Sequence, residues 1–203
     1  MSRARHHKLI YCGTAHRLAE LKITAKTSLD FSEFSQIRHP PVASVVLGFR
    51  REDVTHPCHG FGMLIPKIEG FNILGAIFSS ALFSNRAPAG HLTLTCYVGG
   101  ERQPELASLP PEKLFPLVTE DLRRLLGVRG QPTFAHRVFW PRAIPQYNVG
   151  YGRFRDLMTD IEQKAPGLLL AGGYRDGISL GDSIVSGGNV AERVIGEWKQ
   201  ANN

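Results

Sequence analysis

The sequence has 203 residues, 42% hydrophobic and 21% charged, an ordinary globular composition that is long enough to bury one or two cores. Its net charge is +6, but lysine and arginine form only small clusters, so a nucleic-acid surface is not indicated. Three widely spaced cysteines without a CxxC pair argue against a disulfide framework and a zinc site, and no apolar run reaches the ~20 residues of a membrane span. We therefore expect a cytoplasmic protein, with peripheral contact to a membrane surface left open.

The first half of the sequence predicts short strands between glycine and proline turns. Lys8–Cys12 has strand character, and a Gly13-Thr14 turn leads into a helical stretch at Ala15–Ile23. Val42–Phe49 is almost continuously apolar, which is typical of a strand covered on both faces. Three further strand candidates are Gly62–Ile65, Asn72–Phe78 and His91–Val98.

The second half alternates helices and strands. From Pro110-Pro111 onward, apolar residues recur every three or four positions as far as Gly127, which predicts an amphipathic helix closed by glycine. The remaining candidates are a strand at Thr133–Trp140, a helix at Tyr151–Gln163, a strand at Leu168–Ala171 and a helix at Gly181–Trp198.

The run from Gly167 to Gly187 is a strand that ends in glycines and leads into a helix rich in small residues. Glycine lets a ligand approach the backbone closely, and the free amides at a helix start can face an anion or an electron-rich ring edge. A tight turn with close helix packing needs the same glycines, so their spacing alone leaves a ligand-free turn open.

The order of residues in this run resembles the closing flavin-binding motif of the oxygen-dependent protoporphyrinogen oxidases, a branch of the amine-oxidase-like flavoproteins. The matching segments are Ala171-Gly172-Gly173-Tyr174, Gly177-Ile178-Ser179-Leu180, Asp182-Ser183-Ile184 and Ser186-Gly187. The resemblance implies that Ile178, Ser179 and Leu180 contact the flavin through their backbone. Gly173 stands where the family commonly has asparagine, so no side-chain contact is carried over to that position.

Two other regions resemble the same family. The segment Trp140–Gly150 is similar to one in which the tryptophan touches the flavin, although a core tryptophan before a proline-fixed turn would have the same sequence. The blocks Gly60–Pro66, Gly75–Ser80, Phe83–Pro88 and Tyr97–Gly100 follow in the family's order. By this resemblance Phe61, Leu64, Ile77 and Tyr97 line a tetrapyrrole pocket. Burial in a strand core is the alternative for each of these residues.

The resemblance extends over nearly the whole chain and implies an α/β fold with mixed α+β character: the C-terminal part of an FAD/NAD(P)-binding flavoprotein with a mixed-sheet substrate domain. We expect residues 1–40 to form a strand, helix and connector of the FAD domain, 41–130 the substrate-binding portion and 131–203 the C-terminal FAD-binding portion. The family's GxGxxG, which marks the N-terminal Rossmann βαβ unit, is absent from the sequence. We therefore expect this polypeptide alone to bind FAD poorly, and the N-terminal half to be a candidate partner chain.

By the same resemblance, the complete enzyme oxidises protoporphyrinogen IX to protoporphyrin IX in haem biosynthesis, passing hydride equivalents to the flavin, which dioxygen reoxidises. The eight histidines show no metal-binding spacing and no serine lies in a nucleophile elbow, so we predict no catalytic side chain and no metal ligand. Alternative substrates are coproporphyrinogen or an amine. The alternative from another class is a non-catalytic remnant or a partner subunit that completes a flavoprotein.

Overall fold

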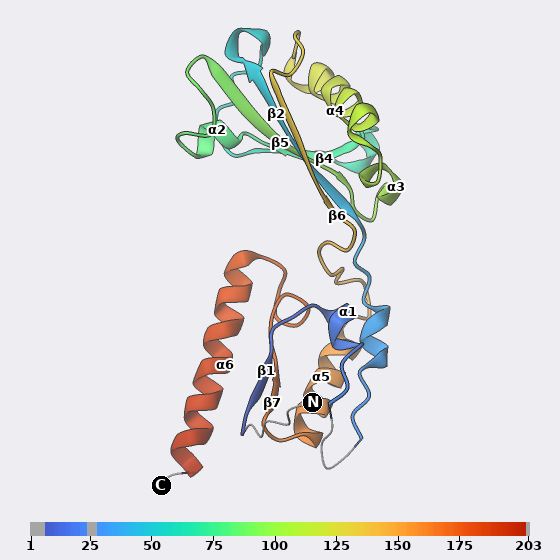
Figure 1. Ribbon diagram of the computed structural model, residues 1–203, viewed down its shortest axis with the longest axis vertical. Coiled ribbons are helices and arrows are strands. Elements are labelled where there is room, and N and C mark those ends of the chain that lie inside the picture. Colours follow the sequence, from blue (N-terminus) through green and yellow to red (C-terminus); the bar gives the residue numbers. More distant parts are fainter. Residues whose placement is uncertain (1–6, 24–27, 202–203) are drawn as a thin grey trace, which may run out of the picture. The chain divides into compact units, whose positions relative to one another are not determined.

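The computed structural model describes residues 7–23 and 28–201, which form two compact units. Unit 1 comprises residues 1–39 and 144–203, and unit 2 comprises residues 40–143. Each unit has strands, helices and a hydrophobic core of its own (Figure 1).

A five-stranded sheet in the order β3-β4-β5-β2-β6 forms the centre of unit 2. Its strands are β2 (Val42–Arg50), β3 (Gly62–Leu64), β4 (Ile73–Ile77), β5 (His91–Gly99) and β6 (Phe134–Trp140). Every pairing among them is antiparallel, so this sheet differs from the expected mixed sheet in its strand directions.

Alternating side chains along β2 and β5 give this sheet one covered face. The core residues on that face are Ala43, Val45, Leu47 and Phe49 from β2 and Leu92, Leu94, Cys96 and Val98 from β5. On the second face, which the short helix α2 (Ser79–Leu82) contacts, Val46 and Tyr97 are half-buried. The prediction that Val42–Phe49 is covered on both faces is therefore wrong, because its second row of side chains remains partly exposed.

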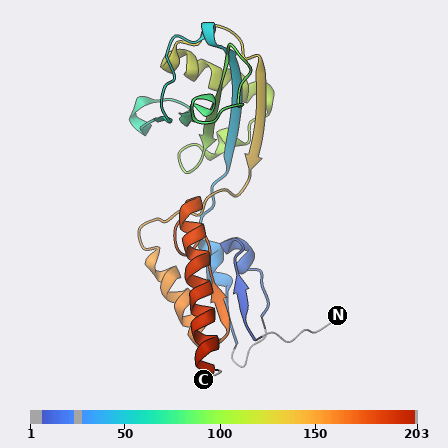
Figure 2. The ribbon, with the colours of Figure 1, turned by 90° about the vertical axis from the view of Figure 1, so that its left-hand side faces the viewer.

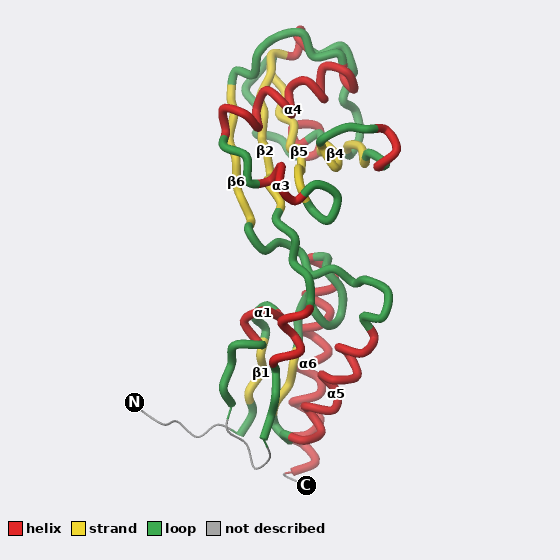
Figure 3. The backbone as a smooth tube through the Cα atoms, turned by 90° about the vertical axis from the view of Figure 1, so that its right-hand side faces the viewer, coloured by secondary structure: helices red, strands yellow, loops and turns green. Residues whose placement is uncertain are grey.

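Helix α4 (Pro111–Leu126) covers the core face, with the short helix α3 (Pro104–Ala107) beside it (Figure 3). The residues of α4 at every fourth position, Leu114, Val118, Leu122 and Leu126, are all buried. The helix ends at Gly127, which has a φ of +63° and donates its N–H to Arg123 O at 3.1 Å. The predicted glycine-closed amphipathic helix is confirmed, because only a residue without Cβ adopts this conformation at low cost.

Unit 1 is built on two short parallel strands, β1 (Leu9–Tyr11) and β7 (Leu168–Leu170). They lie between helix α6 (Leu180–Ala201) and the pair α1 (Ala15–Leu18) and α5 (Gly152–Lys164), as Figures 1 and 2 show. Leu168 and Leu170 pack in the cluster formed with α1 and α5, whereas Leu169 packs against Val190 of α6. β7 is therefore buried on both faces, and the strand predicted at Leu168–Ala171 is present one residue shorter.

The remaining differences from the sequence prediction lie at element ends and at unit boundaries. α1 ends at Leu18, five residues before the predicted end at Ile23. The units divide at 39/40 and 143/144, whereas the sequence suggests 40/41 and 130/131, because β6 pairs with β2 inside unit 2. The sequence analysis also does not predict the short helices α2 and α3 or the 3-10 helices η1 (Ser32–Gln36), η2 (Arg51–Asp53) and η3 (Lys67–Glu69).

Helix α6 exposes apolar side chains along much of its length. Leu180, Ile184, Val185 and Ile195 are all exposed, from 52% for Ile195 to 80% for Leu180. Even so, none of the helices in the described residues is long and apolar enough to span a bilayer. These exposed apolar side chains need a partner surface to become buried.

Candidate functional site

The four residues assigned by sequence to a tetrapyrrole pocket surround one hollow of about 270 Å³ in unit 2. Phe61 precedes β3, Leu64 ends it, Ile77 ends β4 and Tyr97 lies in β5. Phe61 is 70% and Leu64 is 90% exposed, so burial in a strand core does not account for these two residues. The structure brings the four side chains together at the partly exposed face of the sheet.

A larger hollow of about 770 Å³ adjoins the first one, because Ile77 and Tyr97 line both. The sheet forms its floor, and α2 with the loop after it supplies a wall. The other lining residues are Val46, Gly48, Ser79, Phe83, Arg86, Pro88, His91, Leu92, Thr93, Thr95, Thr133, Phe134 and His136. Its volume lies within the roughly 300–1,000 Å³ of small-molecule sites.

Trp140 belongs to the same sheet face as Tyr97. Trp140 pairs with Val42, and Tyr97 pairs with Ser44 two residues further along β2, so all these side chains point to one side. The indole is 55% exposed, which a core tryptophan would not be. Trp140 is not among the residues that line either hollow, and its contact with a flavin stays a prediction.

The other three residues assigned to the flavin, Ile178, Ser179 and Leu180, lie in unit 1 where the glycine-rich turn enters α6. Ser179 N donates to Asp182 Oδ2 and Asp182 N donates to Ser179 Oγ, each at 3.0 Å, which is a reciprocal helix cap. These hydrogen bonds lower the pKa of the Asp182 carboxyl. The protein's own carboxylate thus takes the anion position at this helix start, which favours a ring edge over a phosphate as the external partner.

Tyr147 bridges the two sides of the glycine-rich turn. Its hydroxyl donates to Gly173 O at 2.8 Å and accepts from Gly177 N at 3.1 Å. Burial raises the pKa of the Tyr147 phenol, which therefore keeps the proton it donates. The ring also stacks on Tyr151 at 4.1 Å between centroids. Tyr147 thus fixes the turn that leads directly into the predicted flavin-contacting residues.

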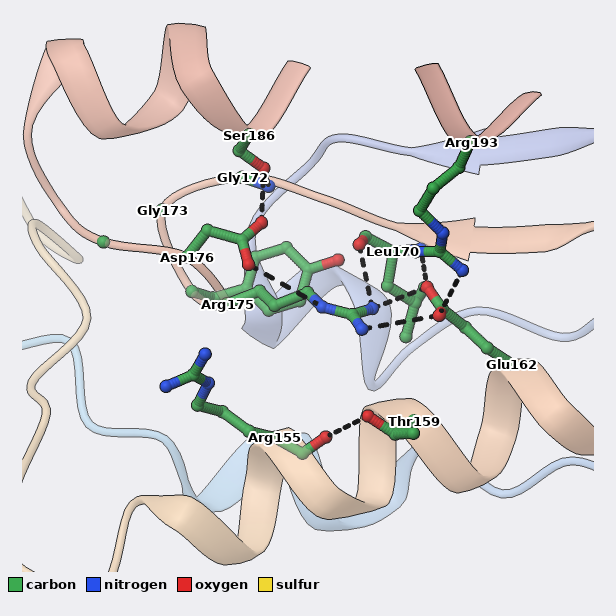
Figure 4. A network of polar contacts seen from close by, with 12 residues as sticks. Arg155, Thr159, Glu162, Leu170, Gly172, Gly173, Arg175, Asp176, Ser186 and Arg193 are labelled. Atoms are coloured by element: carbon green, nitrogen blue, oxygen red, sulfur yellow. Dashed lines mark hydrogen bonds and ion pairs between the residues drawn. The ribbon is translucent and has the colours of Figure 1, made fainter. Parts of the chain in front are cut away.

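A largely buried ion cluster ties α5, β7 and α6 together (Figure 4). Glu162 of α5 accepts from Leu170 N at 2.7 Å and pairs with Arg175 at 2.5 Å and with Arg193 of α6 at 2.9 Å. Burial alone would raise the pKa of Glu162, but these donors outweigh it and hold the pKa below its ordinary 4.5. Glu162 is therefore the common acceptor for three elements of unit 1.

A second polar link holds the glycine-rich turn against α6 (Figure 4). The buried Ser186 hydroxyl accepts from Gly172 N at 3.1 Å and donates to Asp176 Oδ2. Gly172 has a φ of +112°, a conformation that residues with a Cβ rarely adopt. Both ends of the turn are thus fastened to the rest of unit 1.

Sequence reasoning missed the roles of Tyr147 and Glu162. Tyr147 stands inside the quoted Trp140–Gly150 segment, but only a structure places its hydroxyl between Gly173 O and Gly177 N. Glu162 lies at the end of an ordinary amphipathic helix, and no pattern in the sequence distinguishes it from a solvated glutamate.

Comparison with known proteins gives matches over most of the chain. The model of one family, described as flavin containing amine oxidoreductase, matches residues 15–195. Mitochondrial protoporphyrinogen oxidase of Nicotiana tabacum is 39% identical over 163 residues, which are 79% of this chain and 32% of that protein. Protoporphyrinogen oxidase 2, chloroplastic/mitochondrial, of Arabidopsis thaliana is 37% identical over 171 residues, 83% of this chain and 34% of that protein. The chain thus spans about a third of the length of these curated relatives.

A solved structure agrees with the fold. A crystal structure assigned as a protoporphyrinogen oxidase from Exiguobacterium sp. 255-15 superposes with a TM-score of 0.74 at 21% identity, covering 92% of this chain and 40% of that one. At this identity the likeness concerns the fold alone, and it confirms the predicted mixed α/β flavoprotein class.

The first prediction concerns the acid stability of unit 1. A carboxyl whose folded pKa is lowered stabilises the fold above its ordinary value of 4.5, and this contribution disappears as pH falls through the folded pKa. Glu162→Gln should lower the free energy of unfolding at neutral pH by about 2 kcal/mol and flatten its decline below about pH 4.5. Urea unfolding across the pH range measures this. Asp160→Asn, on the same helix but in an exposed pair with Lys164, is the control; equal curves for the two variants contradict the assignment.

The second prediction concerns the turn itself. Tyr147→Phe keeps the stacked ring and removes both hydrogen bonds, so the Gly177 amide should exchange with solvent about tenfold faster. Residue-resolved hydrogen exchange measures the change. Tyr97→Phe removes a phenol from unit 2 and should leave Gly177 unaffected. Unchanged exchange at Gly177 in Tyr147→Phe would mean that the bridge does not hold the turn.

Proposed function

The chain belongs to the family of flavin-containing amine oxidoreductases, and on that premise we propose that it supplies the porphyrinogen-binding sheet and closing flavin segment of an FAD-dependent protoporphyrinogen oxidase. One observation carries the proposal: Phe61, Leu64, Ile77 and Tyr97 converge on a single hollow at a sheet face that leaves apolar side chains exposed. The similarity to plant protoporphyrinogen oxidases supports the choice of substrate class.

In this proposal the residues of the chain bind and orient a largely apolar macrocycle. Ile77 and Tyr97 lie between the two adjoining hollows, so one extended ligand can occupy both. The apolar floor excludes water from the bound ring system. When bound, FAD would supply the redox chemistry that these residues lack, as the hydride acceptor for the porphyrinogen with dioxygen as the final oxidant.

Taken unit by unit, the proposed flavin contacts are the backbone of Ile178, Ser179 and Leu180 in unit 1 and the Trp140 side chain in unit 2. They fit a flat ring system, because Trp140 and Ile178 each expose apolar surface. The Ser179 amide already donates to Asp182, so its neighbours provide the freer backbone groups. The hydrogen bonds of Tyr147 with Gly173 and Gly177, and that of Ser186 with Gly172, hold the turn that precedes this segment.

The adenosine and pyrophosphate of FAD require a site that these 203 residues do not encode in GxGxxG form. We infer that a dinucleotide-binding part of the family fold, on the same polypeptide or on another, supplies it and covers the exposed apolar face of α6. A cytoplasmic location with peripheral membrane contact remains our proposal for the whole protein.

The third prediction tests this function. The chain alone should retain no stoichiometric flavin after incubation with FAD, and oxidation of protoporphyrinogen, followed as protoporphyrin fluorescence, should require the N-terminal part of a family relative added in trans. Leu64→Gln should then raise the KM for protoporphyrinogen about tenfold, from the lost apolar contact. Ile68→Gln, at a residue equally exposed but outside the hollows, should not.

Three outcomes would decide against the proposal. A flavin-loaded complex that oxidises an amine but no porphyrinogen would exclude the substrate class. A clear preference for coproporphyrinogen would select the alternative tetrapyrrole. Flavin loading without any oxidation would favour a non-catalytic subunit.

A further inference from the structure

The larger hollow changes character from one end to the other. Near Tyr97 it opens into the apolar hollow around Leu64 and Phe61. Near His91, at the start of β5, its lining is polar and cationic, with Arg86, His91, Thr93 and Thr133. Six residue steps along a strand separate His91 from Tyr97, which is about 20 Å. The groove therefore suits a ligand with an apolar body and an anionic edge.

The backbone of Arg86 is fixed at the cationic end of the hollow by a hydrogen bond to its carbonyl. The Thr93 hydroxyl donates to Arg86 O at 2.7 Å, and Thr93 N donates to Ser80 Oγ at 3.0 Å, so the loop is fastened to β5 and α2. The preceding residue, Asn85, has a φ of +65°, a conformation that turns the chain sharply and that asparagine tolerates better than most residues. This arrangement fixes where the arginine side chain begins.

The guanidinium of Arg86 forms no ion pair with any of the described residues. Its carbon lies 5.7 Å from the centroid of the Phe83 ring, which also lines the hollow. No salt bridge among residues 7–23 and 28–201 involves Arg86. A permanently charged, planar donor stacked on an aromatic wall is suited to bind a carboxylate in the hollow.

We propose that Arg86 binds a carboxylate side chain of the tetrapyrrole, so that the acidic edge of the macrocycle lies toward His91 and the apolar edge toward Leu64 and Phe61. This inference rests on the proposed function and adds the orientation of the substrate to it. Arg86 then selects for tetrapyrroles with free acids, while the apolar end supplies most of the affinity.

The fourth prediction tests this orientation with stable probes. Mesoporphyrin, with free carboxylates, and its dimethyl ester are titrated into the full chain in dilute neutral detergent, and binding is followed by quenching of protein fluorescence. The chain should bind the acid about tenfold more tightly than the ester. Arg86→Gln should remove that preference and leave the affinity for the ester unchanged.

Arg123→Gln is the matched control, because it removes the same charge from α4 on the covered side of the sheet. It should retain the preference for the acid. Equal loss of acid binding in both variants, or loss of ester binding in Arg86→Gln, would overturn the role of Arg86. Equal binding of acid and ester by the unaltered chain would overturn it as well, with the tetrapyrrole site intact. Absence of binding by both porphyrins would overturn the tetrapyrrole site and this inference together.

Discussion

The period-two alternation of side chains along β2 and β5 is the constraint on which the rest of unit 2 depends. One row of side chains meets α4 and fills the core, so the other row must point away from it. That second row contains apolar and aromatic residues that no long helix of the described chain covers. In the proposed function, a flat apolar ligand would lie on this second row and would offset the cost of exposing it to water.

Unit 1 meets a different requirement, because the flavin contacts proposed for it are made by backbone atoms. A glycine-rich turn has little stability of its own, so its shape comes from side chains anchored elsewhere. Tyr147 and Ser186 hold its two sides, and Glu162 ties the strand before it to α6 after it. The Asp182 cap completes the helix start without an external anion. Together these contacts keep the segment 178–180 in one conformation with its apolar side chains exposed.

Strand and helix positions could be predicted because periodicity and glycine placement report local geometry directly, as at Gly127. The sequence could not predict which faces of a strand are covered. The apolar run Val42–Phe49 would be the same whether a helix or a ligand packs against its second row of side chains. The family resemblance predicted that Phe61, Leu64, Ile77 and Tyr97, which are far apart in the sequence, line one site. The structure places them around one hollow. The roles of Arg86 and Tyr147 could not be predicted from the sequence, because they depend on which atoms lie next to these side chains in the folded chain.

We propose that the partly exposed face of the five-stranded sheet is the surface of unit 2 that binds the tetrapyrrole. Hydrogen exchange of the full chain with and without mesoporphyrin tests it most directly. Binding should slow exchange in residues 60–65 and 83–97, around the two hollows, and leave exchange along α6 unchanged. Protection confined to α6, or absent from both segments of unit 2, would contradict the claim.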